Sequence, residues 1–304
     1  FFLYLTIVHL GRRIIEKTGR KPNTANSIAS YGAGVVGALA YCWSDTFWFS
    51  AVEAEVYAMS SLLTAAVFWM ILKWEEEADR EYADRWIVLI AFMMGLSIGV
   101  HLLNLLVIPA IAFVYYYKKS PVITTWKSFK VLALSGVILG LILWGIIPYL
   151  PKCAAAFDLL FVNTFGLPFN SGAAFFVLLL LALCFVAIYY TRKIEKPLWN
   201  TIALCFTMIV IGYSAFAVVV IRSVNNTPTN EGQPNNPFAL VKYLGREQYG
   251  SVPLIYGPSF ASLPTDYKET TYYTNLGDKY HKVAGPIDYI FPSDSKMLFP
   301  RMHS

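Results

Sequence analysis

Long apolar runs alternate with short clusters of Lys and Arg along the first 221 residues. The chain opens on an apolar segment at 1–10, and further apolar stretches cover residues 31–50, 56–72, 86–117, 131–150, 173–190 and 201–221. A transmembrane helix needs about 20 such residues. Hydrophobic residues make up 57% of the chain and charged residues 14%, against roughly 45–50% and about 25% in soluble domains. The pattern predicts an all-α multi-pass membrane protein. It excludes a disordered chain, a secreted disulfide scaffold and an ordinary cytosolic enzyme.

The apolar stretch 86–117 decides the topology. Its 32 residues contain Gly95, Gly99, His101, Asn104 and Pro109, and a single span needs only about 20. If the stretch is two short helices that meet near His101, 15 of the 16 Lys and Arg residues before residue 222 lie on one side, with Lys152 the exception. If the stretch is one helix, the clusters of Lys and Arg before it and after it fall on opposite sides of the membrane. Basic residues accumulate in cytoplasmic loops, so we expect two helices.

This topology gives about eight membrane segments in a transmembrane bundle over residues 1–222. Residues 75–85 are expected to form a charged cytoplasmic loop, and residues 152–172 a loop rich in Phe, Asn, Gly and Pro. Residues 223–304 are polar, with many Pro, Gly and Tyr and nearly balanced charges. We expect them to form a small extracytoplasmic segment that continues beyond the chain.

The outer face then carries few acids before residue 222, namely Asp45, Glu53, Glu55 and Asp158. Three of them fall in the aromatic-rich connection at 43–57. Ionisable groups near the membrane are costly and are often functional. A carboxylate between aromatic rings is a candidate general base. The alternative is that these acids are solvated loop residues.

His101 and Asn104 are three residues apart and share a face if the segment is helical. Both side chains are able to donate a hydrogen bond to a phosphate or a sugar hydroxyl. The expected topology puts them on the same side as Glu55. The alternative is that they satisfy each other or a turn backbone inside the bundle.

Three stretches together resemble the protein O-mannosyltransferases of the GT-C type. They are Phe47-Trp48-Phe49-Ser50-Ala51-Val52-Glu53-Ala54-Glu55-Val56-Tyr57, then Gly95-Leu96-Ser97-Ile98-Gly99-Val100-His101, and finally Arg246-Glu247-Gln248-Tyr249-Gly250 with Pro253-Leu254-Ile255-Tyr256-Gly257. The last pair is similar to the bacterial branch of the family. The resemblance covers roughly residues 30–304.

The resemblance implies a GT-C-like helical bundle that moves a sugar, expected to be mannose, to Ser or Thr of exported proteins. The donor is a sugar on a polyprenyl phosphate, with no covalently bound cofactor. The implied location is the plasma (inner) membrane, with the active face and the C-terminal segment extracytoplasmic. Family members carry an acidic first outer loop of the form W-D-x-G-E-F, which this chain lacks. It is therefore expected to be a fragment without the first helix and the main catalytic acid.

The predicted site combines the residue patterns with this resemblance. Glu53 and Glu55 are the candidate catalytic carboxylates. Trp48, Tyr57, His101 and Asn104 are the candidate substrate-binding residues, and the aromatic rings would contact the first isoprenes of the lipid carrier. The expected partners are the lipid carrier, an exported acceptor protein and membrane lipids.

Other functions remain open from the sequence. A transporter or flippase would also use broken helices with polar residues at depth, and a non-catalytic assembly protein would bind partners through its outer segment. The basic clusters lie between apolar runs, which marks topology and not a nucleic-acid surface. No CxxC or HExxH pattern indicates a metal site.

Overall fold

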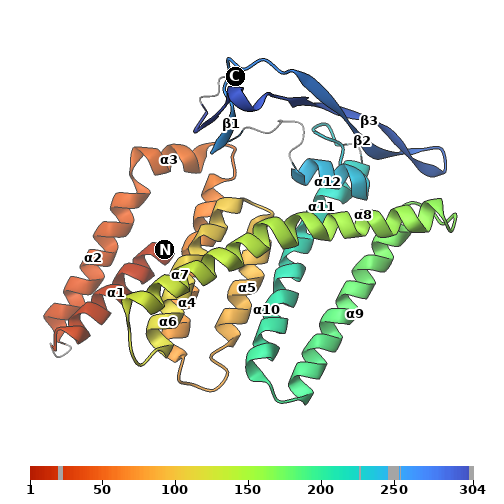
Figure 1. Ribbon diagram of the computed structural model, residues 1–304. Coiled ribbons are helices and arrows are strands. Elements are labelled where there is room, and N and C mark those ends of the chain that lie inside the picture. The colour runs from red at the N-terminus through yellow and green to blue at the C-terminus, as the bar shows by residue number, and fades with distance from the viewer. Residues whose placement is uncertain (20–22, 226, 246–252, 254, 301–304) are drawn as a thin grey trace. The chain divides into compact units, whose positions relative to one another are not determined.

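The computed structural model describes residues 1–304 except 20–22, 226, 246–252, 254 and 301–304. Most of the described chain is helical, and the strands lie near the C-terminal end (Figure 1). The chain divides into two compact units. Unit 1 consists of residues 1–142 and 181–216, and unit 2 consists of residues 143–180 and 217–304. The division predicted at residue 222 separates a transmembrane bundle from a segment outside the membrane. It describes membrane environment and not compactness, so it stays a prediction beside this division into two units.

The helices and short helical turns follow one another closely. They are α1 (Phe2–Lys17), α2 (Thr24–Cys42), α3 (Asp45–Val52), α4 (Tyr57–Glu77), α5 (Arg85–Ile98), η1 (Leu102–Val107), α6 (Ile108–Lys119), α7 (Thr125–Gly140), η2 (Leu141–Ile146), α8 (Ile147–Asn163), α9 (Ser171–Lys193), α10 (Pro197–Tyr213), η3 (Ser214–Phe216), α11 (Ala217–Val224), α12 (Pro237–Gly245) and η5 (Ser293–Ser295). The strands are β1 (Tyr256–Pro258), β2 (Asp266–Leu276), β3 (Lys279–Ile290) and β4 (Lys296–Leu298).

Five of the eight predicted membrane segments are helices long and apolar enough to cross a membrane. Within the described residues these are 57–77, 102–119, 125–163, 171–193 and 197–224. Helix α5 is apolar but has only 14 residues. The predicted stretch 31–50 is divided between α2 and α3, because the backbone leaves the helical conformation at Trp43 and Ser44. A multi-pass membrane fold follows from the five long helices.

The stretch 86–117 is two helices, which confirms the prediction. Helix α5 ends at Ile98, and His101 has an extended backbone before η1 and α6 begin. The far end of α6 returns to the connection between α4 and α5. There, the Lys118 ammonium pairs with the Asp79 carboxylate at 2.8 Å, and Lys119 donates to the Ala78 carbonyl at 2.9 Å. The hydrogen bond and the charge of Lys118 lower the pKa of Asp79.

Small residues hold α5 against α10. A Cβ added at Gly95 would overlap the backbone of Ile209, and one added at Gly212 would overlap the backbone near Leu96. Glycine at both positions lets the two backbones approach closely, as is common between membrane helices. This contact fixes the short helix α5 within unit 1.

Two of the expected loops are partly helical. The predicted loop at 152–172 is wrong over its first half, since α8 continues to Asn163. Pro148 and Pro151 lie inside α8 and do not end the helix. Instead, the π-helical turn η2 directly precedes them and joins α7 to α8 without interruption. A wider turn accommodates the missing N–H and the ring of a proline. The predicted charged loop at 75–85 begins later, because α4 includes Glu75, Glu76 and Glu77.

The C-terminal part of unit 2 contains no candidate membrane helix among its described residues beyond 224. Strands β2 and β3 form an antiparallel hairpin in which Tyr267 lies opposite Tyr289, and β1 pairs with β4. Phe238 on α12 contacts the rings of Tyr273 and Tyr280, which attaches the hairpin to α12. The REQYG stretch at 246–250 lies outside the described residues.

The return of α6 to the connection between α4 and α5 is testable by crosslinking. In a variant with the four native cysteines replaced by serine, we expect Asp79→Cys and Lys118→Cys to be joined by a short bifunctional maleimide in membranes. One continuous helix over 86–117 would separate these ends by about 50 Å at 1.5 Å per residue. The pair Asp79→Cys with Leu103→Cys is the matched control and should stay uncrosslinked. Crosslinking of the control pair but not of the first pair would contradict the fold.

The close approach of α5 and α10 predicts a cost for added volume. Gly95→Ala should lower stability by about 1–3 kcal/mol, the usual cost of overpacking, seen as a lower melting temperature in detergent. Gly136→Ala is the control, since nothing lies within 4 Å of a Cβ there. Equal melting temperatures for the two variants would argue against this helix contact.

Candidate functional site

The two candidate catalytic carboxylates lie in the short connection between α3 and α4. Helix α3 ends at Val52, and the chain bends through residues 53–56 before α4 begins at Tyr57. The Glu55 N–H donates to the Glu53 carbonyl at 2.8 Å, which tightens this bend. Both glutamates are exposed, and neither carboxylate has an ion pair or side-chain hydrogen bond within the described part of the chain. They are therefore free to accept a proton or a hydrogen bond.

Tyr57 and His101 are brought together, as the predicted site requires. Their ring centroids are 5.8 Å apart. His101 caps η1, because its Nδ1 accepts the Leu103 backbone N–H at 3.2 Å. A backbone N–H only donates, so Nδ1 is the acceptor, and the neutral ring carries its proton on Nε2. His101 thus offers one N–H donor beside Tyr57.

The glutamates lie close to this pair along the chain. Glu55 is two residues before Tyr57, so their Cα atoms are at most about 7 Å apart. The acidic connection, Tyr57 and the break at His101 therefore belong to one end of unit 1. The sequence predicted this grouping from the parity of the spans.

Asn104 is part of a buried contact and not of an open surface. It is 2% exposed. Its Oδ1 accepts the Ser60 hydroxyl in a short hydrogen bond and the Thr64 hydroxyl at 2.9 Å. Its Nδ2 is buried and has no partner among the described residues. This arrangement ties η1 to α4 and favours a role in positioning His101 over direct contact with a substrate.

Three large aromatic side chains that shortly precede the acidic connection in the sequence are exposed. Trp43, Trp48 and Phe49 all present more than half of their surface. Apolar area of this size is typical of surfaces that face lipid or bind a ligand. Their contact with the isoprenes of a lipid carrier stays a prediction.

Sequence reasoning missed the ion pairs at the opposite end of α4. His9 contacts Glu76 through Nδ1 at 2.9 Å and Glu75 through Nε2 at 3.0 Å. Arg13 pairs with Glu75 at 3.2 Å, and Lys73 pairs with Glu76 at 2.6 Å. The expectation of a solvated acidic loop is therefore wrong for Glu75 and Glu76. The i, i+4 spacing of His9 and Arg13 was the available signal, since it puts both on one helix face.

Asp158, one of the outer-face acids, is an internal anchor of unit 2. It is fully buried. Its carboxylate accepts the backbone N–H groups of Asn170, Gly172 and Ala173 at 2.9–3.3 Å and the Tyr280 hydroxyl at 2.7 Å. Two of these N–H groups belong to the first turn of α9, where a negative charge is stabilised. With its oxygens occupied in this way, Asp158 is not available as a general base.

Tyr280 is held from several directions. The Asn163 side chain donates to the Tyr280 carbonyl at 2.8 Å and accepts the Tyr280 N–H at 2.9 Å. The ring packs edge-on against Phe169 and Phe238. The hairpin is thereby fastened to the α8–α9 turn. Burial first, and then the hydrogen bond to Asp158, raise the pKa of Tyr280.

Comparison with known proteins identifies two stretches of this chain. Residues 1–124 match the family described as the protein O-mannosyl-transferase TMEM260 N-terminal domain. Residues 250–304 match a family of unknown function, DUF8416. No curated protein and no solved structure matches the chain. The first match supports the resemblance to protein O-mannosyltransferases, and it covers every predicted site residue from Trp48 to Asn104.

The contact between Tyr280 and Asp158 predicts a specific dependence on pH. An unfolded tyrosine ionises near pH 10, whereas the native contact keeps Tyr280 protonated. Its stabilising effect is therefore complete below about pH 10 and is lost as the pH rises further. Tyr280→Phe should cost about 1.5–3 kcal/mol at pH 8, as expected for a hydrogen bond to a charged group. The difference from wild type should shrink in melting curves above pH 10.

Tyr289→Phe is the matched control, because Tyr289 lies on the same strand and is exposed. It should melt like the wild type at every pH. If Tyr280→Phe also melts like the wild type at pH 8, the contact does not anchor the hairpin.

Proposed function

We propose that this chain is the membrane part of a protein O-mannosyltransferase of the bacterial branch. It moves mannose from a polyprenyl-phosphate carrier to Ser or Thr of exported proteins. The observation that carries the proposal is the family match over residues 1–124. Inside that stretch, two unpaired carboxylates lie next to the contact between Tyr57 and His101. A glycosyltransfer site needs a base and a donor to the leaving phosphate, and this end of unit 1 has both types of group.

In the proposed reaction, the acceptor hydroxyl oxygen attacks the anomeric carbon of the lipid-linked sugar. The bond between that carbon and the phosphate oxygen breaks, and the polyprenyl phosphate leaves with the bonding electrons. Glu53 or Glu55 takes the hydroxyl proton as general base. The reaction is balanced without a redox step or a further co-reactant.

The neighbouring side chains hold the substrates in this scheme. The Nε2–H of His101 donates to a phosphate oxygen and stabilises the charge of the leaving group. The exposed rings of Trp48 and Phe49 contact the first isoprenes of the carrier. Asn104 holds η1 against α4 through Ser60 and Thr64 and so keeps His101 in place. Preorganised groups of this kind avoid reorganisation during the reaction.

The proposal also sets the location. All basic residues before residue 222 except Lys152 face the cytoplasm, so the α3–α4 connection faces outward, as does the segment 223–304. The membrane is the plasma (inner) membrane. Exported proteins reach the site from that side, and the lipid carrier reaches it through the outer leaflet.

Glutamate substitutions test the proposed base. In the full-length protein, Glu53→Gln or Glu55→Gln should lower the rate of mannose transfer by about 10²–10⁴-fold, the usual contribution of a general base, with little change in KM for the lipid donor. Only one of the two glutamates acts as the base, so the variant of the other glutamate should lose much less transfer activity. The assay measures transfer of radiolabelled mannose from polyprenyl-phosphate mannose to a Ser/Thr-rich peptide.

Glu81→Gln serves as the control, because it removes an acid from the loop at the opposite end of α4. It should transfer mannose at the wild-type rate. Full activity in both the Glu53 and Glu55 variants would remove these residues as the base. Movement of the lipid-linked sugar across vesicle membranes without any transfer would favour a flippase instead.

A further inference from the structure

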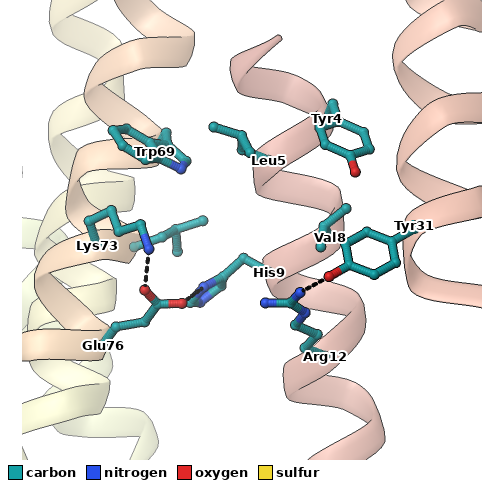
Figure 2. A pocket seen from close by; sticks show the side chains of 10 residues that line it. Tyr4, Leu5, Val8, His9, Arg12, Tyr31, Trp69, Lys73 and Glu76 are labelled. Carbon is teal, nitrogen blue, oxygen red and sulfur yellow. Dashed lines mark hydrogen bonds and ion pairs between the residues drawn. The ribbon is translucent and has the colours of Figure 1, made fainter. Parts of the chain in front are cut away.

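A hollow of about 180 Å³ lies between α1, α2 and α4 of unit 1, at the end of α4 opposite Tyr57 (Figure 2). Trp69 and Lys73 on its wall are 12 and 16 residues beyond Tyr57, which is about 18–24 Å along the helix. It is thus separate from the proposed transfer site. Its volume is below the roughly 300–1,000 Å³ of drug-sized ligand pockets, and it suits a group of phosphate size.

The hollow changes character along its length. Leu5 and Tyr4 from α1 and Trp69 from α4 form one apolar level (Figure 2). His9, Arg12, Lys73 and Glu76 form a polar level, one to two helical turns further along. In the expected topology this polar level lies towards the cytoplasmic boundary and the apolar level lies deeper. A phospholipid has the same order, with a charged headgroup at the boundary and an acyl chain below it.

Arg12 differs from the other basic side chains that line the hollow. His9 contacts two carboxylates, and Lys73 pairs with Glu76. Arg12, in contrast, has no carboxylate partner within the described residues. It donates to the Tyr31 hydroxyl at 2.5 Å and lies over the Tyr31 ring, 5.2 Å from its centroid. One of its five N–H donors is used in this bond, and the others are available for an anion.

The aromatic rings of the hollow fit the same occupant. Trp and Tyr are enriched at membrane boundaries, where their polar and apolar parts contact the two environments. The Lys73 ammonium lies 5.9 Å from the Trp69 ring centroid. Basic pockets between membrane helices on the cytoplasmic side are known headgroup sites.

We propose that this hollow binds the headgroup phosphate of an anionic phospholipid of the cytoplasmic leaflet. Arg12 makes the direct contact, and Tyr31 orients its guanidinium. Glu76 neutralises the charge of Lys73, so Arg12 supplies the positive charge that the phosphate meets. The first part of the acyl chain lies along Leu5 and Trp69. The lipid would join α1 and α2 to α4 at the end of the bundle opposite the transfer site.

Native mass spectrometry of the full-length protein tests this site. The protein is titrated in detergent with phosphatidylglycerol, and in parallel with phosphatidylcholine of the same chains. Wild type should retain one phosphatidylglycerol at least fivefold more tightly than phosphatidylcholine. Arg12→Gln should weaken phosphatidylglycerol binding about fivefold to tenfold, in line with about 1 kcal/mol per basic residue near a membrane.

Lys17→Gln is the matched control, because it removes a positive charge from the last turn of the same helix without lining the hollow. It should bind phosphatidylglycerol like the wild type. Tyr31→Phe keeps the charge of Arg12 and removes the hydroxyl that orients it, so a smaller loss is expected. This second variant also covers the case in which Arg12→Gln does not fold.

Three results would overturn the proposal. They are equal binding of the two lipids by wild type, equal losses in the Arg12 and Lys17 variants, and unchanged phosphatidylglycerol binding in Arg12→Gln. In a further titration, inorganic phosphate is added at millimolar concentration to the protein with bound phosphatidylglycerol. Displacement of the lipid by phosphate alone would assign the hollow to a free phosphate and not to a phospholipid. Persistence of the lipid supports the proposal.

Discussion

The thickness of a bilayer controls the arrangement of unit 1. Its hydrocarbon core takes about 20 helical residues, and the stretch 86–117 has 32. The chain meets this constraint with a break between Ile98 and Leu102, after which α6 returns to the connection between α4 and α5. The ion pair between Lys118 and Asp79 holds the end of α6 to this connection. In the topology expected from the sequence, this return sets the direction of the later segments and groups 15 of the 16 basic residues before residue 222 on one side.

A break inside a membrane bundle leaves backbone groups without helical partners, and the His101 side chain satisfies one of them by accepting the Leu103 N–H. The Asn104 side chain accepts the hydroxyls of Ser60 and Thr64 and so ties the break to α4. These bonds stabilise the break and also hold a histidine N–H donor beside Tyr57. The residues that stabilise the break are thus also the residues that hold the proposed hydrogen-bond donor in place. This is a physical reason for a polar site to form where an apolar stretch is too long for one span and too short for two full ones.

The sequence was sufficient where the signal is local or set by membrane thickness. The helical pair at 86–117 and the neighbourhood of Tyr57 and His101 followed from span length and charge. Asp158 could not be assigned in this way, because its partner Tyr280 is 122 residues away. The roles of Glu75 and Glu76 likewise depend on His9, which lies more than 60 residues earlier. The length of α8 was missed because the π-helical turn η2 carries the helix past two prolines that usually end one.

The most direct measurement is the sidedness of the α3–α4 connection relative to the α6–α7 connection. With the native cysteines replaced by serine, Glu55→Cys and Val122→Cys each place one thiol at an exposed position. In intact cells, a membrane-impermeant maleimide should label position 55 at once and position 122 only after the membrane is permeabilised. Labelling of both positions in intact cells, or of position 122 alone, would contradict the topology and remove the basis for an outward-facing transfer site.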